Sequence, residues 1–407
     1  MSLAEPTLGN SPRSYGSVAK TLHWLTALLI LTAIPLGVVA NNLPYDTSAQ
    51  LATKGWLFSL HKTVGIAAFT VAVLRILWAA SQPKPALLHP DRRLESWAAE
   101  TVHWMLYASL VIVPLSGWLH HAATQGFAPI LWPFGQTLPL IPVNDGVAHF
   151  FAAWHWLFTK VLIASLILHI AGALKHHLID RDDTLRRMLP GHVAAGDGAA
   201  AHPRGPVAAA VAIWAVLMAG GSALGLAGQT DAPAVPQLQA QPSGWVVQEG
   251  TLAITATQFG SPVEGQFDDW TAAIEFDPDA PGPDMGTVTV QISIPSVTLG
   301  SVTSEALKPE FFDAEAHPTA TFDAQIMTAE GENAYVAEGT LTLKGATVPL
   351  SLPFELTLDG DTARMSGQTV IDRRDYGIGT NSYADEETVA HDVTVSVSLV
   401  AERDQGE

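Results

Sequence analysis

Residues 154–169 read WHWLFTKVLIASLILH, an apolar run with a histidine near each end. In an α-helix the fourteen residues from His155 to His169 make almost four full turns and rise about 21 Å. Both imidazoles therefore lie on one face, near opposite ends of the segment. A helix of this length and hydrophobicity can cross a bilayer, so the stretch predicts a membrane helix that carries two potential metal ligands.

Other apolar stretches lie on either side of this one. Together the candidates cover about residues 22–40, 57–80, 98–119, 151–174 and 206–228. Each is near the roughly 20 residues that a spanning helix needs, so we expect a membrane α-helical bundle of four helices plus a fifth helix. Two alternatives remain open: the first stretch could be a cleavable signal peptide, and the fifth an internal export signal that is cut.

Charge is distributed unevenly along the 407 residues. Residues 1–205 contain 14 Lys and Arg against 10 Asp and Glu, and the remainder contains 6 against 29, so the net charge of −19 lies almost wholly in the C-terminal half. An acidic surface repels nucleic acid, so we expect no nucleic-acid partner. The absence of cysteine excludes disulfides, thiolate catalysis, and Cys-ligated zinc, iron–sulfur clusters or c-type haem.

Basic residues indicate the orientation in the membrane. They precede the first stretch, separate the second from the third and follow the fourth: Arg13, Lys20, Lys84, Arg92, Arg93, Lys175, Arg181, Arg186 and Arg187. Residues 120–150 contain no Lys or Arg, and Lys54 is alone between the first two stretches. The positive-inside rule then predicts a cytoplasmic N-terminus. Five crossings would place the C-terminal half outside, in the periplasm beyond a bacterial inner membrane.

Histidines open the first two stretches as well. His23 begins the first on the inner side, at the level of His169, and His61 begins the second on the outer side, at the level of His155. Each histidine alone could be an interfacial polar residue, but four at matched depths indicate two metal sites with two imidazoles each. Two axial imidazoles suit haem b better than zinc, which takes four ligands or three plus water.

Two further residues fall at the inner level. His103 begins the third stretch and is a fifth candidate ligand, although a polar contact near the inner haem suits it better because it has no partner of its own. Arg75 lies fourteen residues after His61 on the same helix face. It could neutralise haem propionates, or it could be an arginine that extends from the helix end to the membrane surface.

Residues of this half resemble the bacterial cytochrome b561 family over about residues 14–190. The resemblance rests on Leu22-His23-Trp24, Leu60-His61-Lys62 with Gly65, Trp154-His155 with His169, and the ending from His176-His177 to Pro190. It implies a four-helix membrane bundle with two haem b groups ligated by His23, His61, His155 and His169. It also implies exchange of electrons with the quinone pool, through ubiquinone or another quinone. Some relatives resemble superoxide:quinone oxidoreductases.

The C-terminal half has a different pattern. Residues 229–244 have three prolines and no periodicity, which is typical of an extended linker. From Trp245 onward, runs such as TVTVQISI at 287–294 alternate with period two, which predicts antiparallel strands in a barrel or a sandwich. Acidic residues such as Asp372 are expected in solvated turns. The division is a di-haem domain at 1–190, a connector and fifth helix at 191–228, the linker, and a β-domain at 245–407.

This β-domain resembles the YceI-like, polyisoprenoid-binding family over about residues 245–402. The motifs include GQFDDW at 265–270, FFD at 311–313, PTATF at 318–322, GTLTLKG at 339–345 and IDRRDYGIG at 371–379. The resemblance implies a lipocalin-like antiparallel barrel whose apolar interior holds a prenyl chain, with Ile292, Phe322 and Leu350 expected among the inward residues. The opening strand departs from the family, with GTLAIT at 250–255 where relatives carry a histidine and a serine.

Taken together, these features predict a membrane electron-transfer protein. It would exchange electrons between the periplasmic side, where superoxide is one possible donor, and the quinone pool through two b haems, while the periplasmic barrel binds a prenylated lipid or quinone. The alternative is an isoprenoid-lipid carrier module that is anchored by a cytochrome and has no direct catalytic coupling to it.

Overall fold

The computed structural model describes residues 7–124, 128–191, 193, 205–226, 238 and 243–404. The chain divides into a helical unit and a barrel unit, each with its own internal contacts. Of the predicted linker at 229–244, residues 229–237 and 239–242 lie outside the described residues.

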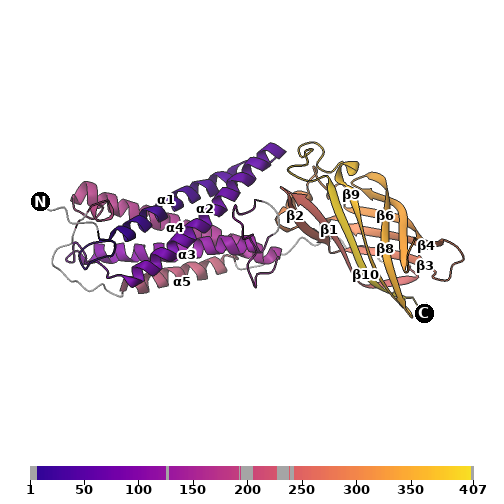
Figure 1. The fold of residues 1–407 in the computed structure, drawn as a ribbon, viewed down its shortest axis with the longest axis horizontal. Helices are drawn as coiled ribbons and strands as arrows, with labels where there is room; N and C mark the ends of the chain where they lie inside the picture. The colour runs from indigo at the N-terminus through magenta and orange to yellow at the C-terminus, as the bar shows by residue number, and fades with distance from the viewer. Residues whose placement is uncertain are drawn as a thin grey trace. The chain divides into compact units, whose positions relative to one another are not determined.

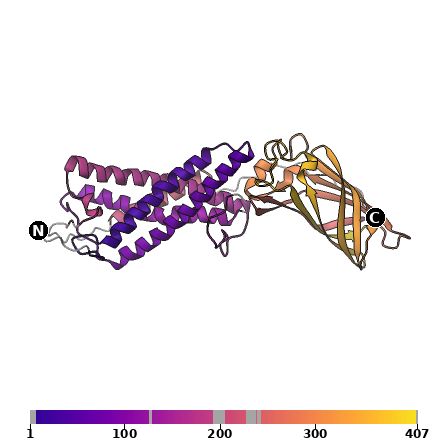
Figure 2. The same cartoon turned by 45° about the horizontal axis from the view of Figure 1, so that its top comes forward.

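Long apolar helices make up the helical unit (Figures 1 and 2). Within the described residues they are α1 (Ser17–Asn42), α2 (Ser48–Ser81), α3 (Arg93–Ala122), α4 (Asp145–Lys175) and α5 (Gly205–Ala223). Five candidate spans are long and apolar enough to cross a membrane, and they coincide with these helices, the fourth being extended to Asp180. This confirms the predicted helical bundle with a fifth helix.

The fifth helix packs against the fourth. The indole of Trp214 on α5 meets the ring of Phe158 on α4 with their centres 5.4 Å apart. A Cβ added at Gly221 on α5 would lie 3.1 Å from the ring of Trp154, so the glycine leaves room for that indole. These side chains belong to one buried cluster with residues of α3, and α5 is therefore an integral part of the helical unit.

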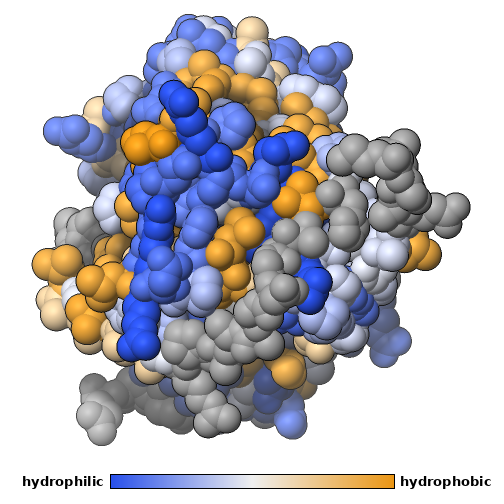
Figure 3. Space-filling model, turned by 90° about the vertical axis from the view of Figure 1, so that its left-hand side faces the viewer, coloured by the Kyte–Doolittle hydropathy of each residue, from blue (hydrophilic) through white to orange (hydrophobic). Residues whose placement is uncertain are grey.

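A cluster of polar residues lies at the C-terminal end of α4. Here α4 continues as a π-helical turn (His176–Asp180), and Asp182 contacts His176 Nδ1 at 2.6 Å and His89 Nε2 at 2.9 Å. Burial alone would raise the pKa of Asp182, but hydrogen bonds from Thr184 and the two imidazoles hold it well below its usual range. Figure 3 looks onto this end of the helical unit, over which hydrophilic residues gather.

The barrel unit is a closed antiparallel sheet. Its strands are β1 (Trp245–Gln258), β2 (Ser261–Phe267), β3 (Trp270–Phe276), β4 (Asp284–Ser293), β5 (Val297–Thr298), β6 (Thr319–Thr328), β7 (Ala334–Leu343), β8 (Ala346–Asp359), β9 (Thr362–Asp372) and β10 (Asp392–Arg403). Pairing follows the ring β1, β3, β4, β6, β7, β8, β9, β10 and returns to β1, while β2 and β5 extend from the other edge of β1. In the part of the chain that the structure describes, the predicted lipocalin-like barrel is thus confirmed as eight strands in a closed ring.

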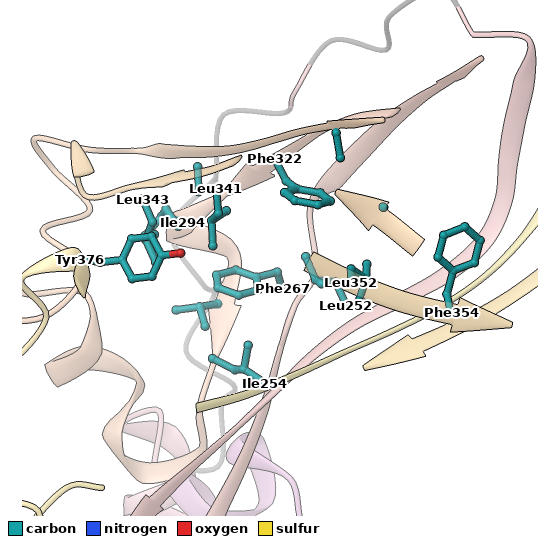
Figure 4. Packing of buried hydrophobic residues seen from close by; sticks show 14 of the residues in the cluster. Leu252, Ile254, Phe267, Ile294, Phe322, Leu341, Leu343, Leu352, Phe354 and Tyr376 are labelled. Atoms are coloured by element: carbon teal, nitrogen blue, oxygen red, sulfur yellow. The ribbon is translucent and has the colours of Figure 1, made fainter. Parts of the chain in front are cut away.

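Strand alternation fills the barrel with apolar side chains. Figure 4 shows Leu252, Phe267, Phe322 and Leu352 directed towards a shared interior, and all four belong to one buried cluster. Ile292, Phe322 and Leu350, which the alternating pattern predicts to face inward, all line the internal cavity.

Candidate functional site

The first site in the helical unit is the pair His61 on α2 and His155 on α4. Their ring centres lie 6.3 Å apart with an interplanar angle of 78°. His61 lies in the N-terminal half of α2, and His155 lies in the N-terminal half of α4. We call this the outer pair, after the side of the membrane that the sequence predicts for it.

Backbone carbonyls orient both rings of the outer pair. His61 Nδ1 lies 2.8 Å from the carbonyl oxygen of Ala33 on α1, and His155 Nδ1 lies 2.9 Å from that of Val113 on α3. A carbonyl only accepts hydrogen bonds, so Nδ1 of each ring carries the proton. Each Nε2 is left with a free lone pair, which is the tautomer that an axial metal ligand needs.

Two glycines make this orientation possible. A Cβ added at Gly37 would lie 2.8 Å from Cε1 of His61, and one added at Gly117 would lie 3.0 Å from Cε1 of His155. Each glycine comes four residues after the accepting carbonyl, on the same helix face. The same local arrangement therefore occurs twice, once on α1 and once on α3, and it holds the Nδ1–Cε1 edge of an imidazole against a helix backbone.

The second site is the pair His23 on α1 and His169 on α4, which we call the inner pair. Their ring centres lie 6.1 Å apart with an interplanar angle of 60°. Arg75 Nη2 lies 3.1 Å from Nδ1 of His23, so Arg75 reaches the inner level as its sequence position predicts. The ring centre of His103 lies 5.0 Å from that of His169, edge to face.

Both pairs fit one iron atom between two imidazoles. Two metal–nitrogen bonds of about 2 Å, each extended by about 1 Å to the ring centre, place the centres about 6 Å apart. The donor set also fits, since each site offers two neutral imidazoles in apolar surroundings and the chain contains no cysteine. The glycine cradles fix the ring orientation at the outer pair. At the inner pair Arg75 donates to Nδ1 of His23, so ligation through Nε2 of that ring requires Nδ1 to be released and protonated.

Two polar residues of the outer level were missed by the sequence analysis. Lys62 follows His61 directly and is only 6% exposed. The indole Nε1 of Trp118, next to Gly117, is buried and has no hydrogen-bond acceptor among the described residues. A lysine inside an apolar span is a signal that could have identified the first, whereas the unpaired indole becomes visible only from the packing.

The barrel encloses an apolar cavity of about 520 Å³. This volume lies in the range of ligand pockets, which are mostly apolar with a few polar groups. Barrel residues that line it include Leu252, Ile254, Phe267, Ile292, Phe322, Leu341, Leu350, Leu352, Val395 and Leu399. Few polar side chains join them, among them Gln258, Glu305 and Arg373.

Arg373 is a structural residue at the cavity wall. It is 2% exposed, and its guanidinium donates to the backbone carbonyls of Ile378, Gly379, Tyr383, Val389 and Ala390. These bonds engage all three guanidinium nitrogens, so Arg373 fixes the connection between β9 and β10.

Gly250 in β1 packs against a tryptophan of β3. A Cβ added at Gly250 would lie 2.5 Å from the indole of Trp270, so this indole occupies the space that a side chain at position 250 would need. Gly250 thus allows Trp270, which also lines the cavity, to pack across β1.

Comparison with known proteins separates the same two parts. Residues 14–191 match the family model described as prokaryotic cytochrome b561, and residues 245–401 match the YceI-like domain. Cytochrome b561 homolog 2 of Escherichia coli (strain K12) is 34% identical over 185 residues, which are 44% of this chain and 93% of that protein. Probable superoxide oxidase CybB of Yersinia pestis is 26% identical over 179 residues, 44% of this chain and 97% of that protein.

A solved structure matches the C-terminal part. The crystal structure of Burkholderia cenocepacia BcnA has 28% sequence identity and a TM-score of 0.35, and the comparison covers 37% of this chain and 95% of that one. With the helices, the barrel and both family matches in view, the chain belongs to the cytochrome b561 family over residues 14–191 and carries a YceI-like domain over residues 245–401.

Proposed function

We propose that the protein carries single electrons across the inner membrane between the periplasmic side and the quinone pool. Two b haems would be held by the inner and outer histidine pairs, and the barrel would bind a prenylated lipid or quinone. The observation that carries the proposal is the presence of two imidazole pairs, 6.1 and 6.3 Å between ring centres, that share one helix. Their α4 members are separated by about 21 Å of helix rise.

The histidines of the two pairs would hold each haem by presenting imidazole nitrogens in fixed orientations. Bis-histidine ligation closes both axial positions, so a haem bound there supplies one-electron transfer rather than oxygen binding. His61 and His155 are locked by the Ala33 and Val113 carbonyls, which limits the reorganisation that accompanies a change in charge. Stacking two such sites along α4 provides a route through the apolar layer.

Buried cations at each level support the binding of anionic groups. Arg75 touches the inner pair, and Lys62 is buried beside the outer pair. A charged side chain in a membrane span is costly unless it is paired. Haem propionates would offer both cations an additional anionic partner, with Trp118 Nε1 as a further donor at the outer level.

The barrel suits a long apolar chain. Each buried CH₂ contributes about 0.8 kcal/mol, so a few prenyl units bind firmly in a dry cavity. Quinones carry such chains, and tethering a prenyl-binding barrel to a quinone-reactive cytochrome raises the local ligand concentration. The distribution of Lys and Arg supports a cytoplasmic N-terminus, and with it a periplasmic barrel.

Superoxide is a specific candidate for the electron donor. The relative from Yersinia pestis, named as a probable superoxide oxidase, covers nearly the whole cytochrome part. In this version the outer pair receives the electron and the quinone takes it up. A xanthine oxidase assay on purified protein with ubiquinone tests this donor, and haem reduction that superoxide dismutase does not inhibit would exclude it.

Anaerobic haem oxidation tests the main proposal. Reduced protein is mixed with ubiquinone and the haem α-band is followed, for the full chain and for a variant that ends before residue 229. We expect both proteins to be oxidised at saturating quinone, and the full chain to be faster at limiting quinone. Failure of ubiquinone to oxidise either protein contradicts the electron-transfer role. Equal rates at limiting quinone would instead favour a barrel that is tethered without coupling.

A further inference from the structure

The inward row of β1 ends in a polar side chain. Alternate residues of this strand face the barrel interior: Leu252, Ile254, Ala256 and Gln258 all line the cavity. Leu252 and Ile254 are buried apolar residues, and Ala256 is small. Gln258 continues the row and is only 9% exposed, so strand geometry directs its amide into the cavity.

The side-chain oxygen of Gln258 is buried and has no hydrogen-bond partner among the described residues. Burial of an unpaired acceptor is unfavourable, and native proteins pair most such groups. The backbone nearby does not need this oxygen, because Phe259 N donates to Thr388 O and Ala390 N donates to Thr257 O. The amide of Gln258 is therefore available to a molecule inside the cavity.

The chemistry around Gln258 distinguishes between possible head groups. Val389 lies directly opposite Gln258 in an isolated bridge, and its carbonyl already accepts from Arg373. Because carbonyls engage every nitrogen of Arg373, this cation has no donor directed at an anion. Two further charged residues line the cavity: Glu305, whose carboxylate pairs with Lys308, and Lys54. The amide of Gln258 itself is neutral and supplies no charge for an anion.

We propose that Gln258 binds the hydroxyl of a prenylated ligand, so that the barrel selects hydroxyl-bearing isoprenoids over the bare hydrocarbon. This inference rests on the proposed prenyl-binding role of the barrel and specifies the ligand's polar end. An amide offers an acceptor and donors in one plane, which matches a hydroxyl that both donates and accepts. Prenols and reduced quinones share this group.

Competition in native mass spectrometry tests the proposal on the full chain in detergent. Equimolar geranylgeraniol and the C20 hydrocarbon lacking the hydroxyl compete for the barrel, and a second arm compares decylubiquinol with decylubiquinone. We expect about tenfold preference for the alcohol over the hydrocarbon, as for sites built to pair a ligand hydroxyl. In the second arm, preference for decylubiquinol over decylubiquinone would show that the hydroxyls of a reduced quinone are also selected.

Variants assign the preference to one residue. Gln258→Leu and Gln258→Met should lose the preference while keeping hydrocarbon uptake, which also shows that the barrel remains folded. Gln325→Leu is the matched control, because Gln325 is an exposed, outward-facing glutamine on β6. A wild-type protein that binds the alcohol and the hydrocarbon equally overturns this inference and leaves the prenyl-binding role intact. No uptake of any chain by the wild type contradicts that role itself.

Discussion

At the scale of single residues, glycines set how the outer pair is held. Gly37 and Gly117 each leave room for an imidazole edge beside a helix backbone. The carbonyl one turn earlier accepts a hydrogen bond from Nδ1 of that imidazole. Ligand identity and ligand orientation thus come from different helices, since the rings belong to α2 and α4 and the carbonyls to α1 and α3.

Alanine at either glycine should disturb the outer haem alone. The new Cβ would lie 2.8 Å from Cε1 of His61 at Gly37, closer than real Cβ contacts allow, and 3.0 Å from Cε1 of His155 at Gly117, tighter than most of them, so each imidazole must shift. We expect Gly37→Ala and Gly117→Ala to lower the midpoint potential of one haem or remove it, with the other haem unchanged. Redox titration followed at the haem α-band measures this.

Gly172→Ala is the control for that substitution. Gly172 lies on α4 three residues after His169, and nothing lies within 4 Å of the position that its Cβ would take. The redox titration of the Gly172→Ala variant should match that of the wild type. If Gly172→Ala and Gly37→Ala gave the same change, general weakening of the helices would explain the result instead of the cradle.

The sequence predicts part of the site at this scale. The four histidines and Arg75 are conspicuous because polar groups inside apolar spans are rare. Gly37, Gly117 and Trp118 are not, because glycine and tryptophan are ordinary in membrane helices and their role depends on which ring packs against them. Gln258 could have been found, since alternation places it in the inward row of β1.

At the scale of elements, α4 links the two pairs. It contributes His155 and His169, and each finds its partner on a different helix. The apolar stretches predict these helices with ends shifted by several residues, because apolar composition marks the bilayer layer whereas caps and turns mark the helix ends. Asn144, for example, caps α4 by accepting from Val147 N at 3.0 Å.

Replacing any one of the four histidines with alanine should remove only the haem that its pair holds. His23→Ala or His169→Ala should eliminate the inner haem, and His61→Ala or His155→Ala the outer one, because one imidazole leaves an axial position open. Haem content per chain and low-temperature α-band spectra distinguish the two. His177→Ala, an exposed residue beyond the inner pair, is the control. Loss of the same spectral component from His23→Ala and His61→Ala would mean that the pairing is wrong.

A capped turn in the barrel predicts a pH dependence. The Asp372 carboxylate accepts from Arg374, which lowers its pKa to about 2, whereas the unfolded chain has a value of about 3.9. Because the pKa of Asp372 is lower in the folded than in the unfolded chain, its charge stabilises the barrel at pH values above the unfolded pKa. This stabilisation is lost as the pH falls from about 4 to about 2. Partial exposure limits it to about 1 kcal/mol.

Hydrogen exchange of the β9 amides in the full chain measures this contribution. Asp372→Asn should weaken protection by a constant amount from pH 7 to about pH 5, and the difference from wild type should vanish towards pH 2. Asp359→Asn, at the exposed end of β8, is the control substitution. A difference that persists undiminished at low pH would show that the carboxylate charge is not responsible.

At the scale of the whole molecule, composition already separates the two units. Length and hydropathy predict the helical unit, and period-two alternation predicts the strands of the barrel. Ring closure between β1 and β10 is not a local property of the sequence, because it depends on pairing between strands about 150 residues apart along the chain, and here it was expected from the family resemblance.

Membrane topology makes a further prediction at this scale. A protease site placed within residues 229–244, with an epitope at the C-terminus, should be cut in intact spheroplasts, because five spans and an inside start carry this segment outside. An epitope at the N-terminus should stay protected. Cleavage of the 229–244 site only after the membrane is opened would mean that one of the five helices does not cross.

The most direct test of the account is the haem content of purified protein, determined as pyridine haemochrome per chain, together with a potentiometric titration. We expect two b-type haems per wild-type chain, which titrate as two one-electron components. The His61→Ala and His23→Ala variants should each retain one component. One haem per chain in the wild type, or two haems that survive both substitutions, would contradict the claim that paired histidines hold two haems.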